Sequence, residues 1–449
     1  MSDITIERGA AEAPVTARQR AEEFLSANDI HTVELAFADI PGVARGKRIP
    51  ARHFLKTLER GIPFCKAVLG WDIACDIFPG IDFASFDNGY PDLVAKADTS
   101  TLRTLPWKPG VAWVIADLFT EHGDVAEAAP RHVLKRVISL AEEHAVVPKV
   151  GPELEFYLLD EDLKPLYEGI QCYSTPHAAL FADVLDEIAI ALEEAGIEVE
   201  AAGTEYGPAQ IEINLAYTDA LTAADNTLYF KNAVREIARK HGYVATFMAK
   251  PWAGESGNSF HLHQSLWTLD GETNLFDNDE ALGNSYLAGL QATAREFQAV
   301  VAPTINSYKR FVEQSFAPIN VTWGIDNRTA ATRSLLGEGS ASRIEQRTGS
   351  ADANPYLVTA ANIAAGLHGV DAELVLGERT DHDAYTSPDA QPLPSTLREA
   401  LDIFETSAVA RKTFGDTFTD AFLVIGRHEV EIWEQAVTEW ERDRYLRLV

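Results

Sequence analysis

Cysteine is scarce in this sequence, and no stretch of it is strongly apolar. The three cysteines, Cys65, Cys75 and Cys172, are odd in number and lack C-x-x-C spacing. This usage argues against a disulfide framework and against a cysteine-based zinc site. No apolar run approaches the ~18 residues of a membrane span, and the first twenty residues contain no apolar segment of the secretory type. We therefore predict a cytoplasmic protein that does not enter a membrane.

Basic residues are also few for a chain of 449 residues. The sequence has 38 lysines and arginines against 68 aspartates and glutamates, which gives a formal net charge of -30. Such a charge repels nucleic acids and anionic membranes, so neither is an expected partner. The sequence also lacks the glycine-rich phosphate loops and the kinase H-R-D set. Any bound nucleotide must therefore be held by other groups, such as metal ions and arginines.

Length and composition predict a folded protein of two domains. Hydrophobic residues make up 46% of the chain, close to the average of globular proteins. Residues 1–14 are polar and alanine-rich, and we expect them to be flexible. A small β-rich domain is predicted over 15–120 and a larger domain over 125–449. We predict helices over the following ranges: 16–28, 131–144, 179–195, 220–241, 279–300, 353–369, 395–412 and 417–446.

Four predicted strands carry an unusual polar face. The two-residue period of a strand puts Glu153, Glu155 and Tyr157 on one side of the segment 149–159. The same period groups the polar residues of three more strands: Gln210, Glu212 and Asn214; His261, His263 and Ser265; Arg343, Glu345 and Arg347. A further carboxylate, Glu205, lies in the turn before the second of these strands. An ordinary wet face mixes lysine, threonine, serine and glutamate, whereas five glutamates, two histidines, two arginines and no lysine occur here.

This combination of side chains is typical of a site for metal ions and phosphate. Carboxylates on one face repel each other unless cations lie among them. Oxygen-rich ligand sets with one imidazole suit Mg²⁺ or Mn²⁺ better than Zn²⁺. Two such ions flanked by arginines neutralise the phosphate oxygens in phosphoryl transfer. The four strands therefore indicate an enzyme that uses ATP and at least two divalent ions.

Read in order, these strands resemble the catalytic domain of the glutamine synthetase family. The matching stretches are G-P-E-L-E-F (151–156), E-Y-G-P-A-Q-I-E (205–212), A-T-F-M-A-K-P (245–251), H-L-H-Q-S (261–265), N-S-Y-K-R (306–310), N-R-T-A-A-T-R (327–333), R-I-E-Q-R (343–347) and A-N-P-Y-L (353–357). The resemblance implies an α+β fold with a small β-grasp-like N-terminal domain and a large catalytic domain built on a curved antiparallel sheet. It also implies a homo-oligomer, a dodecamer of two stacked hexamers, with active sites between subunits.

The resemblance further implies roles for individual residues. One metal ion is expected on Glu155, Glu205 and Glu212, and a second on Glu153, His261 and Glu345. Glutamate is expected to contact Arg310, Arg347, Ser256 and Gly257. Phosphate and nucleotide are expected to contact Arg333, Arg343, His263, Ser265 and Tyr217. Arg328 is expected to stabilise the phosphoryl group during its transfer.

The sequence departs from the ammonia-using members of the family at Phe316. Their loop carries a glutamate there, which removes the proton of ammonium, and a phenyl ring cannot accept a proton. Ser256 stands where asparagine is common, and Asn258 is a nearby possible replacement. The aspartate that a neighbouring subunit supplies to bind ammonium corresponds to Asp72 or, less directly, to Asp92, and Asp72 is our candidate for the proton acceptor. These features resemble the γ-glutamylamine branch, in which ATP drives the joining of glutamate to an organic amine, either a monoamine or a polyamine. A true glutamine synthetase and a non-catalytic relative remain the alternatives.

Overall fold

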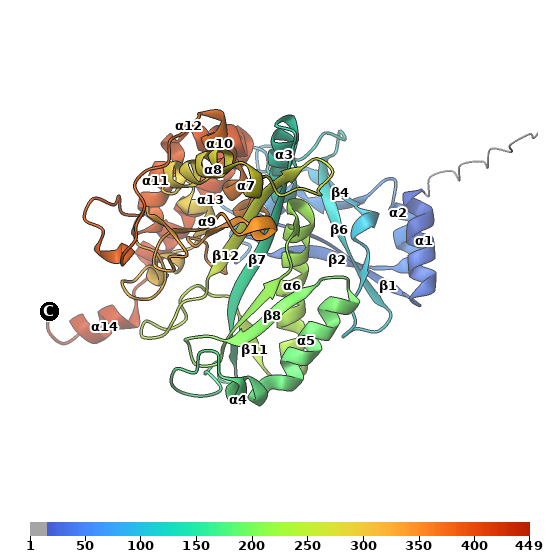
Figure 1. Ribbon diagram of the computed structural model, residues 1–449. Coiled ribbons are helices and arrows are strands. Elements are labelled where there is room, and N and C mark those ends of the chain that lie inside the picture. The colour runs from blue at the N-terminus through green and yellow to red at the C-terminus, as the bar shows by residue number, and fades with distance from the viewer. Residues whose placement is uncertain (1–15) are drawn as a thin grey trace, which may run out of the picture.

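The computed structural model describes residues 16–449, in which helices and two β-sheets share one hydrophobic core (Figure 1). The predicted flexible segment 1–14 and the predicted domain start at residue 15 lie outside the described residues. The expected α+β class is confirmed. No helix in the part of the chain described here is long and apolar enough to span a membrane.

The N-terminal sheet contains six strands: β1 (Thr32–Ala38), β2 (Ala44–Pro50), β3 (Ile62–Cys65), β4 (Asp92–Ala97), β5 (Arg103–Thr104) and β6 (Val111–Thr120). Their order is β2-β1-β6-β4-β3, with β5 paired to β6. The pair β1 and β6 is parallel, and the other pairs are antiparallel. Helices α1 (Ala17–Ala27) and α2 (Ala51–Thr57) pack beside this sheet. Thr16 caps α1 in a capping box with Gln19, which explains why the helix begins where the sequence predicts.

The second sheet contains nine strands: β7 (Val146–Leu159), β8 (Val199–Thr204), β9 (Gln210–Leu215), β10 (Thr218–Asp219), β11 (Val244–Thr246), β12 (Phe260–Thr268), β13 (Trp323–Ile325), β14 (Thr332–Leu335) and β15 (Arg343–Gln346). The order is β13-β14-β15-β12-β7-β9-β8, with β10 and β11 paired to β7. Among the described strands of this second sheet only β13 and β14 pair in parallel, so the expected antiparallel sheet has one parallel edge.

Twelve more helices accompany this sheet in the described chain: α3 (Pro130–Glu143), α4 (Thr175–Ala178), α5 (Ala182–Glu194), α6 (Ala220–Lys240), α7 (Leu275–Asn278), α8 (Glu280–Thr293), α9 (Gln298–Val301), α10 (Pro355–Asp371), α11 (Leu397–Thr406), α12 (Ala408–Phe414), α13 (Asp416–Gln435) and α14 (Glu439–Tyr445). The apolar face of β7 packs on α6, where Phe156 contacts Phe230 at 6.4 Å between ring centroids. The opposite face of the sheet carries the polar residues.

Three of the predicted helices are each divided in the structure. The range 279–300 forms α8 and α9, the range 395–412 forms α11 and α12, and the range 417–446 forms α13 and α14. New N-caps explain two of the breaks: Ser407 accepts a hydrogen bond from the backbone of Ala410, and Thr438 forms a capping box with Glu441. Hydrophobic periodicity continues across such caps and does not reveal them.

Buried polar contacts join the two sheets. Arg131 in α3 forms ion pairs with Asp98 and Asp117 beside the N-terminal sheet and with Asp225 in α6, at 2.9, 2.7 and 2.8 Å. All strands of the first sheet end by Thr120, and α3 begins at Pro130. The division into domains at 15–120 and 125–449 stays a prediction, since one hydrophobic core runs through both parts.

Candidate active site

Strand pairing brings the four predicted polar faces side by side. β12 lies between β15 and β7, and β9 lies on the far side of β7. The pairing places His261 opposite Glu153, His263 opposite Glu345, and Glu155 opposite Glu212. Because neighbouring strands lie about 4.8 Å apart, side chains paired in this way on one face contact each other directly. The sheet therefore gathers the predicted carboxylates and imidazoles into one group.

Glu153, His261 and Glu345 form the centre of this group. His261 Nδ1 lies 3.2 Å from Glu153 Oε1 and 3.5 Å from Glu345 Oε1. Each of the three residues offers a ligand atom within 4.8 Å of the other two, so the set fits a metal ion. The second imidazole, His263, lies 3.2 Å from Glu153 Oε2 through its Nε2. Burial alone would raise the pKa of Glu153, but the bonds with His261 and His263 hold it well below the usual range.

Arginines surround Glu345 and keep its carboxylate charged. Arg347 Nη1 lies 2.5 Å from Glu345 Oε1, and Arg333 Nη1 lies 2.9 Å from Oε2. Burial would raise the pKa of this carboxyl group, but Arg347 and the two histidines lower it to about 2. Arg343, two residues before Glu345 in β15, donates from Nε to His263 Nδ1 at 3.2 Å. The imidazole thus lies between a guanidinium and a carboxylate, which fixes the orientation of its ring.

Glu155, Glu205 and Glu212 form a second group of carboxylates, which lacks a cation among the described residues. Glu155 Oε2 accepts a hydrogen bond from the backbone of Ser259 at 2.6 Å. Burial and the repulsion of Glu155 raise the pKa of Glu205 to about 7. Burial and the repulsion of Glu153 and Glu155 raise the pKa of Glu212 well above its usual range. Such repulsion is relieved when a cation binds, so these residues fit a second metal ion.

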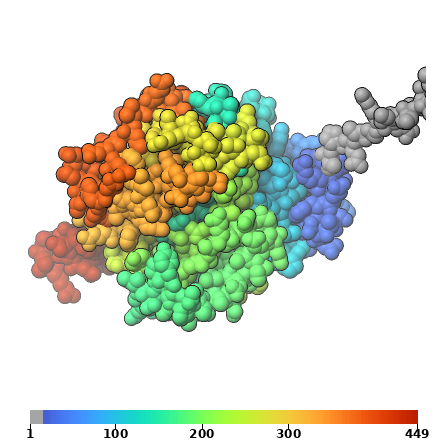
Figure 2. Space-filling model, in the orientation of Figure 1, coloured from blue at the N-terminus to red at the C-terminus, as the bar shows by residue number. Residues whose placement is uncertain are grey.

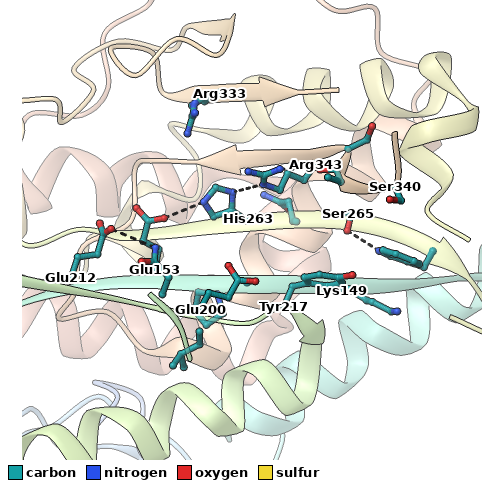
Figure 3. Close-up of a pocket in the computed structure, with 18 of the residues that line it drawn as sticks. Lys149, Glu153, Glu200, Glu212, Tyr217, His263, Ser265, Arg333, Ser340 and Arg343 are labelled. Atoms are coloured by element: carbon teal, nitrogen blue, oxygen red, sulfur yellow. Dashed lines mark hydrogen bonds and ion pairs between the residues drawn. The ribbon is translucent and has the colours of Figure 1, made fainter. Parts of the chain in front are cut away.

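The first of two neighbouring cavities has a volume of about 520 Å³ and extends from Glu153 and Glu212 to an aromatic end (Figure 3). Of the predicted residues it contacts His263, Ser265, Arg328, Arg333, Arg343 and Tyr217. Tyr217 stacks on Trp267 with centroids 5.9 Å apart, and Lys149 Nζ lies 3.9 Å from the Trp267 ring centroid. Trp267 also donates to Ser265 Oγ at 2.8 Å. The cavity thus joins a charged end to a flat aromatic surface.

The second cavity, of about 320 Å³, lies on the other side of the carboxylates. The predicted residues that line it are Glu153, Glu155, Glu205, Glu212, His261, Ser256, Gly257, Arg310, Arg347, Arg328 and Phe316. Arg310 is buried, and its Nη2 donates to the carbonyl of Gly349 at 2.7 Å. A Cβ atom on Gly257 would lie 2.5 Å from Arg310 Cγ, so only glycine permits this close approach. Glu153, Glu212 and Arg328 line both cavities, which therefore meet at the carboxylates.

Phe316 lies on a loop that covers part of the second cavity. Its backbone has φ +59°, in the left-handed region that non-glycine residues rarely adopt. Arg347 Nη2 donates to the Phe316 carbonyl at 3.3 Å, and the Tyr385 hydroxyl donates to the Ala317 carbonyl at 3.0 Å. The residue is 43% exposed, and the centroid of its ring lies 5.6 Å from that of Tyr206. The loop is thus held from behind while the phenyl ring contacts the cavity.

The predicted site residues Glu345 and Asp72 line neither cavity. Glu345 still contacts His261, Arg333 and Arg347, which line the cavities, whereas no such contact connects Asp72 to the site within the described chain. The carboxylate of Asp72 is buried, and Oδ1 accepts hydrogen bonds from the backbone of Ala74 and Asp76, both at 2.9 Å. Trp71 and Trp323 also line neither cavity, and Trp323 donates to the carbonyl of Gly377 at 3.0 Å. The side chains that do form an aromatic wall are Phe316 and Tyr206.

Several cavity residues were not anticipated from the sequence. Lys149 and Trp267 lie at the aromatic end of the first cavity, Tyr206 lines the second, and Tyr173 lines both. Two of these could have been found, because Lys149 and Trp267 continue the polar-face period of their strands from Glu153 and Ser265. Tyr173 lies outside the named strands, so no period marks it.

The fold and the site define a metal-dependent class of enzyme in which a carboxylate-lined sheet lies between two cavities. The glutamine synthetase catalytic domain matches residues 127–445 of this chain. The chain therefore belongs to the glutamine synthetase family, and the predicted resemblance is confirmed. Members of this family use ATP and a divalent metal ion to act on glutamate. The protein is accordingly an ATP-dependent ligase that forms a carbon–nitrogen bond.

Similar proteins include ligases for organic amines. Glutamate–isopropylamine ligase of Pseudomonas sp. is 38% identical over 450 residues, covering 96% of this chain and 98% of that protein. γ-Glutamylethanolamide synthetase GlnA4 of Streptomyces coelicolor is 38% identical over 445 residues and covers 96% of each chain. The solved GmaS/ADP complex superposes with a TM-score of 0.86 at 33% identity, covering 96% of this chain and 100% of that one.

Proposed function

We propose that this protein joins the γ-carboxyl group of glutamate to a small organic amine, through a γ-glutamyl phosphate intermediate, with ATP and two or more Mg²⁺ or Mn²⁺ ions. The observation that carries the proposal is the position of Phe316. This ring lines the second cavity beside Glu205, and the resemblance assigns to its position the proton-accepting glutamate of ammonia-using relatives. The wall it forms with Tyr206 favours an alkyl substituent and does not take a proton.

The two cavities suit the two parts of the reaction. In the first we propose that ATP lies with its adenine near Tyr217 and its phosphates near Arg333, Arg343 and His263. In the second we propose that glutamate binds Arg310 and Arg347, and that Ser256 and Gly257 border it. Guanidinium groups bind carboxylates through two parallel hydrogen bonds, which orients the substrate as well as neutralising it. The buried side chains of Arg310 and Arg347 both line the second cavity, which supports the placement of glutamate there.

The metal ions are proposed to lie between the cavities. One set is Glu153, His261 and Glu345, and the other is Glu155, Glu205 and Glu212. Ions held there would neutralise the phosphate oxygens. The chain itself supplies Arg328, which borders both cavities, to bind the phosphoryl group as it passes from ATP to glutamate. The carboxylate oxygen attacks the γ-phosphorus and ADP leaves. The amine nitrogen then attacks the acyl carbon, the bond from that carbon to the phosphate oxygen breaks, and phosphate leaves with the proton that the amine gives up.

We also propose that the protein works as a homo-oligomer, a dodecamer of two stacked hexamers, as the family resemblance implies. Exposed apolar side chains at the C-terminal end support an association with further copies. They include Val437, Trp440, Leu446 and Leu448. The expected location is the cytoplasm.

A comparison of amines tests the proposed function. We expect kcat/KM to rise from ammonium through methylamine, ethylamine and propylamine. Each buried methylene contributes about 0.8 kcal/mol, so a propyl group favours the amine over ammonia by more than about tenfold. In Phe316→Glu the preference should shift toward ammonium. Val312→Glu adds the same charge to the same loop, at an exposed residue that lines neither cavity, and serves as the control. If ammonium is the best substrate of the wild type, the protein is a glutamine synthetase instead.

A further inference from the structure

A second group of metal-ligating side chains lies outside both cavities. Asp72, Asp76 and His428 each offer one ligand atom, and these atoms all lie within 4.8 Å of one another. Asp72 and Asp76 belong to the loop that follows β3, whereas His428 belongs to α13 near the other end of the chain. The group therefore joins the N-terminal part of the molecule to a C-terminal helix.

The carboxyl group of Asp72 is buried, and no cation of the described chain forms an ion pair with it. Its residue is 3% exposed, and only Oδ1 has hydrogen-bond donors, the backbone groups of Ala74 and Asp76. Among residues 16–449, no lysine, arginine or histidine forms an ion pair with Asp72, Asp76 or Glu429. Glu429 borders the same cavity of about 80 Å³ as Asp72. A buried carboxylate is costly unless it is paired or binds a metal ion, and the neighbouring carboxylates add to that cost.

His428 presents an imidazole that is free to bind a metal ion. Neither ring nitrogen has a hydrogen-bond partner among the described residues. The ring stacks on Phe78, with centroids 3.8 Å apart and an interplanar angle of 25°. Phe78 comes from the same loop as Asp72 and Asp76, so the stack fixes the plane of the imidazole beside the two carboxylates.

We propose that Asp72, Asp76 and His428 hold a divalent metal ion, which fastens the 72–78 loop to α13. One imidazole and two carboxylates, with water in the remaining positions, form a ligand set that binds several divalent ions, and Zn²⁺ is the probe used to detect it. The ion joins segments more than 350 residues apart in the sequence. This assignment replaces the role of proton acceptor that the family resemblance implies for Asp72.

Metal content and thermal stability test the site independently of catalysis. The full-length protein is treated with EDTA, loaded with Zn²⁺ and desalted, and the zinc per chain is then measured. We expect Asp76→Asn and His428→Gln to bind about one zinc ion fewer per chain than the wild type, and to lose the part of the zinc-dependent rise in Tm that this site provides. Asp87→Asn and His122→Gln change the same residue types at exposed positions and should retain the wild-type zinc content.

The exposed position of Asp76 keeps the test decisive, because its substitution leaves the buried packing intact. Equal zinc content in the wild type and Asp76→Asn would overturn the proposal. So would an Asp72→Asn variant that loses kcat while its zinc content is unchanged, since that result assigns Asp72 to proton transfer at another subunit. Both readouts are independent of which amine the enzyme uses, so they succeed or fail separately from the proposed function.

Discussion

Two glutamates of the candidate active site, Glu345 and Glu212, differ sharply in their protonation although they lie on the same face of one sheet. Glu345 is buried against Arg347 and Arg333, and those guanidinium groups keep it ionised at every pH in ordinary use. Glu212 is buried among Glu153, Glu155 and Glu205, so it retains a proton in the absence of metal. Glutamate at position 345 thus carries a permanent charge, whereas glutamate at position 212 becomes charged when a cation binds.

This difference predicts the behaviour of Glu212→Gln. Glutamine resembles the protonated glutamate that the metal-free protein already contains, so the metal-free Tm should stay within a few degrees of that of the wild type. Turnover should fall by about 100-fold or more, because a neutral amide is a poor ligand and leaves the phosphate charge less well neutralised. Steady-state kinetics and thermal unfolding check both parts. Glu198→Gln, an exposed neighbour before β8, is the control; near-wild-type turnover in Glu212→Gln would remove Glu212 from the metal site.

For the strands, the sequence predicts well which residues lie on each face. A period of two is sufficient to place Glu153, His261 and Glu345 on polar faces, because backbone geometry alone fixes that alternation. The order β15-β12-β7-β9 depends on pairings between residues as far apart as Val146 and Thr268 and is not contained in any local pattern. The family resemblance implied a curved antiparallel sheet but no strand order. The conformation of a loop is harder to predict than that of a strand. The position of Phe316 depends on hydrogen bonds from Arg347 and Tyr385 to the carbonyl groups of Phe316 and Ala317, and no local sequence pattern predicts these bonds.

The carboxylates of β7, β9 and the preceding turn predict a pH-dependent stability. The pKa of Glu205 is raised from 4.5 to about 7 in the folded protein. Its stabilising contribution is therefore present below pH 4.5 and is lost as the pH rises through 7. We expect the Tm of the metal-free protein to fall between pH 5.5 and 8, and the increase in Tm caused by Mg²⁺ to grow over the same interval. Glu205→Gln should reduce the fall. An equal effect of Mg²⁺ at both pH values would contradict the assignment.

On the scale of the whole molecule, charge and apolar surface are distributed unevenly. The chain carries a net charge of -30, which opposes close contact between copies. Its C-terminal end nevertheless projects from the body of the molecule as α14 (Figure 2). Trp440 and Leu448 are 61% and 83% exposed in the single chain. Exposed apolar groups that follow one another in this way usually mark a contact surface, and a surface of this kind can offset the repulsion.

Removal of residues 436–449 tests whether this C-terminal segment joins copies of the chain. The cut falls just after α13 ends at Gln435, so no buried side chain of that helix is lost. We expect light scattering to give a large homo-oligomer for the full chain and a smaller assembly for the truncated one, because apolar contacts made by α14 are absent. Trp440→Ala should weaken the assembly less, whereas Asp443→Asn, an exposed polar change in α14, should leave its mass unchanged. An identical mass for the full and truncated chains would show that the contacts between copies lie elsewhere, and the N-terminal sheet would then be the next surface to test.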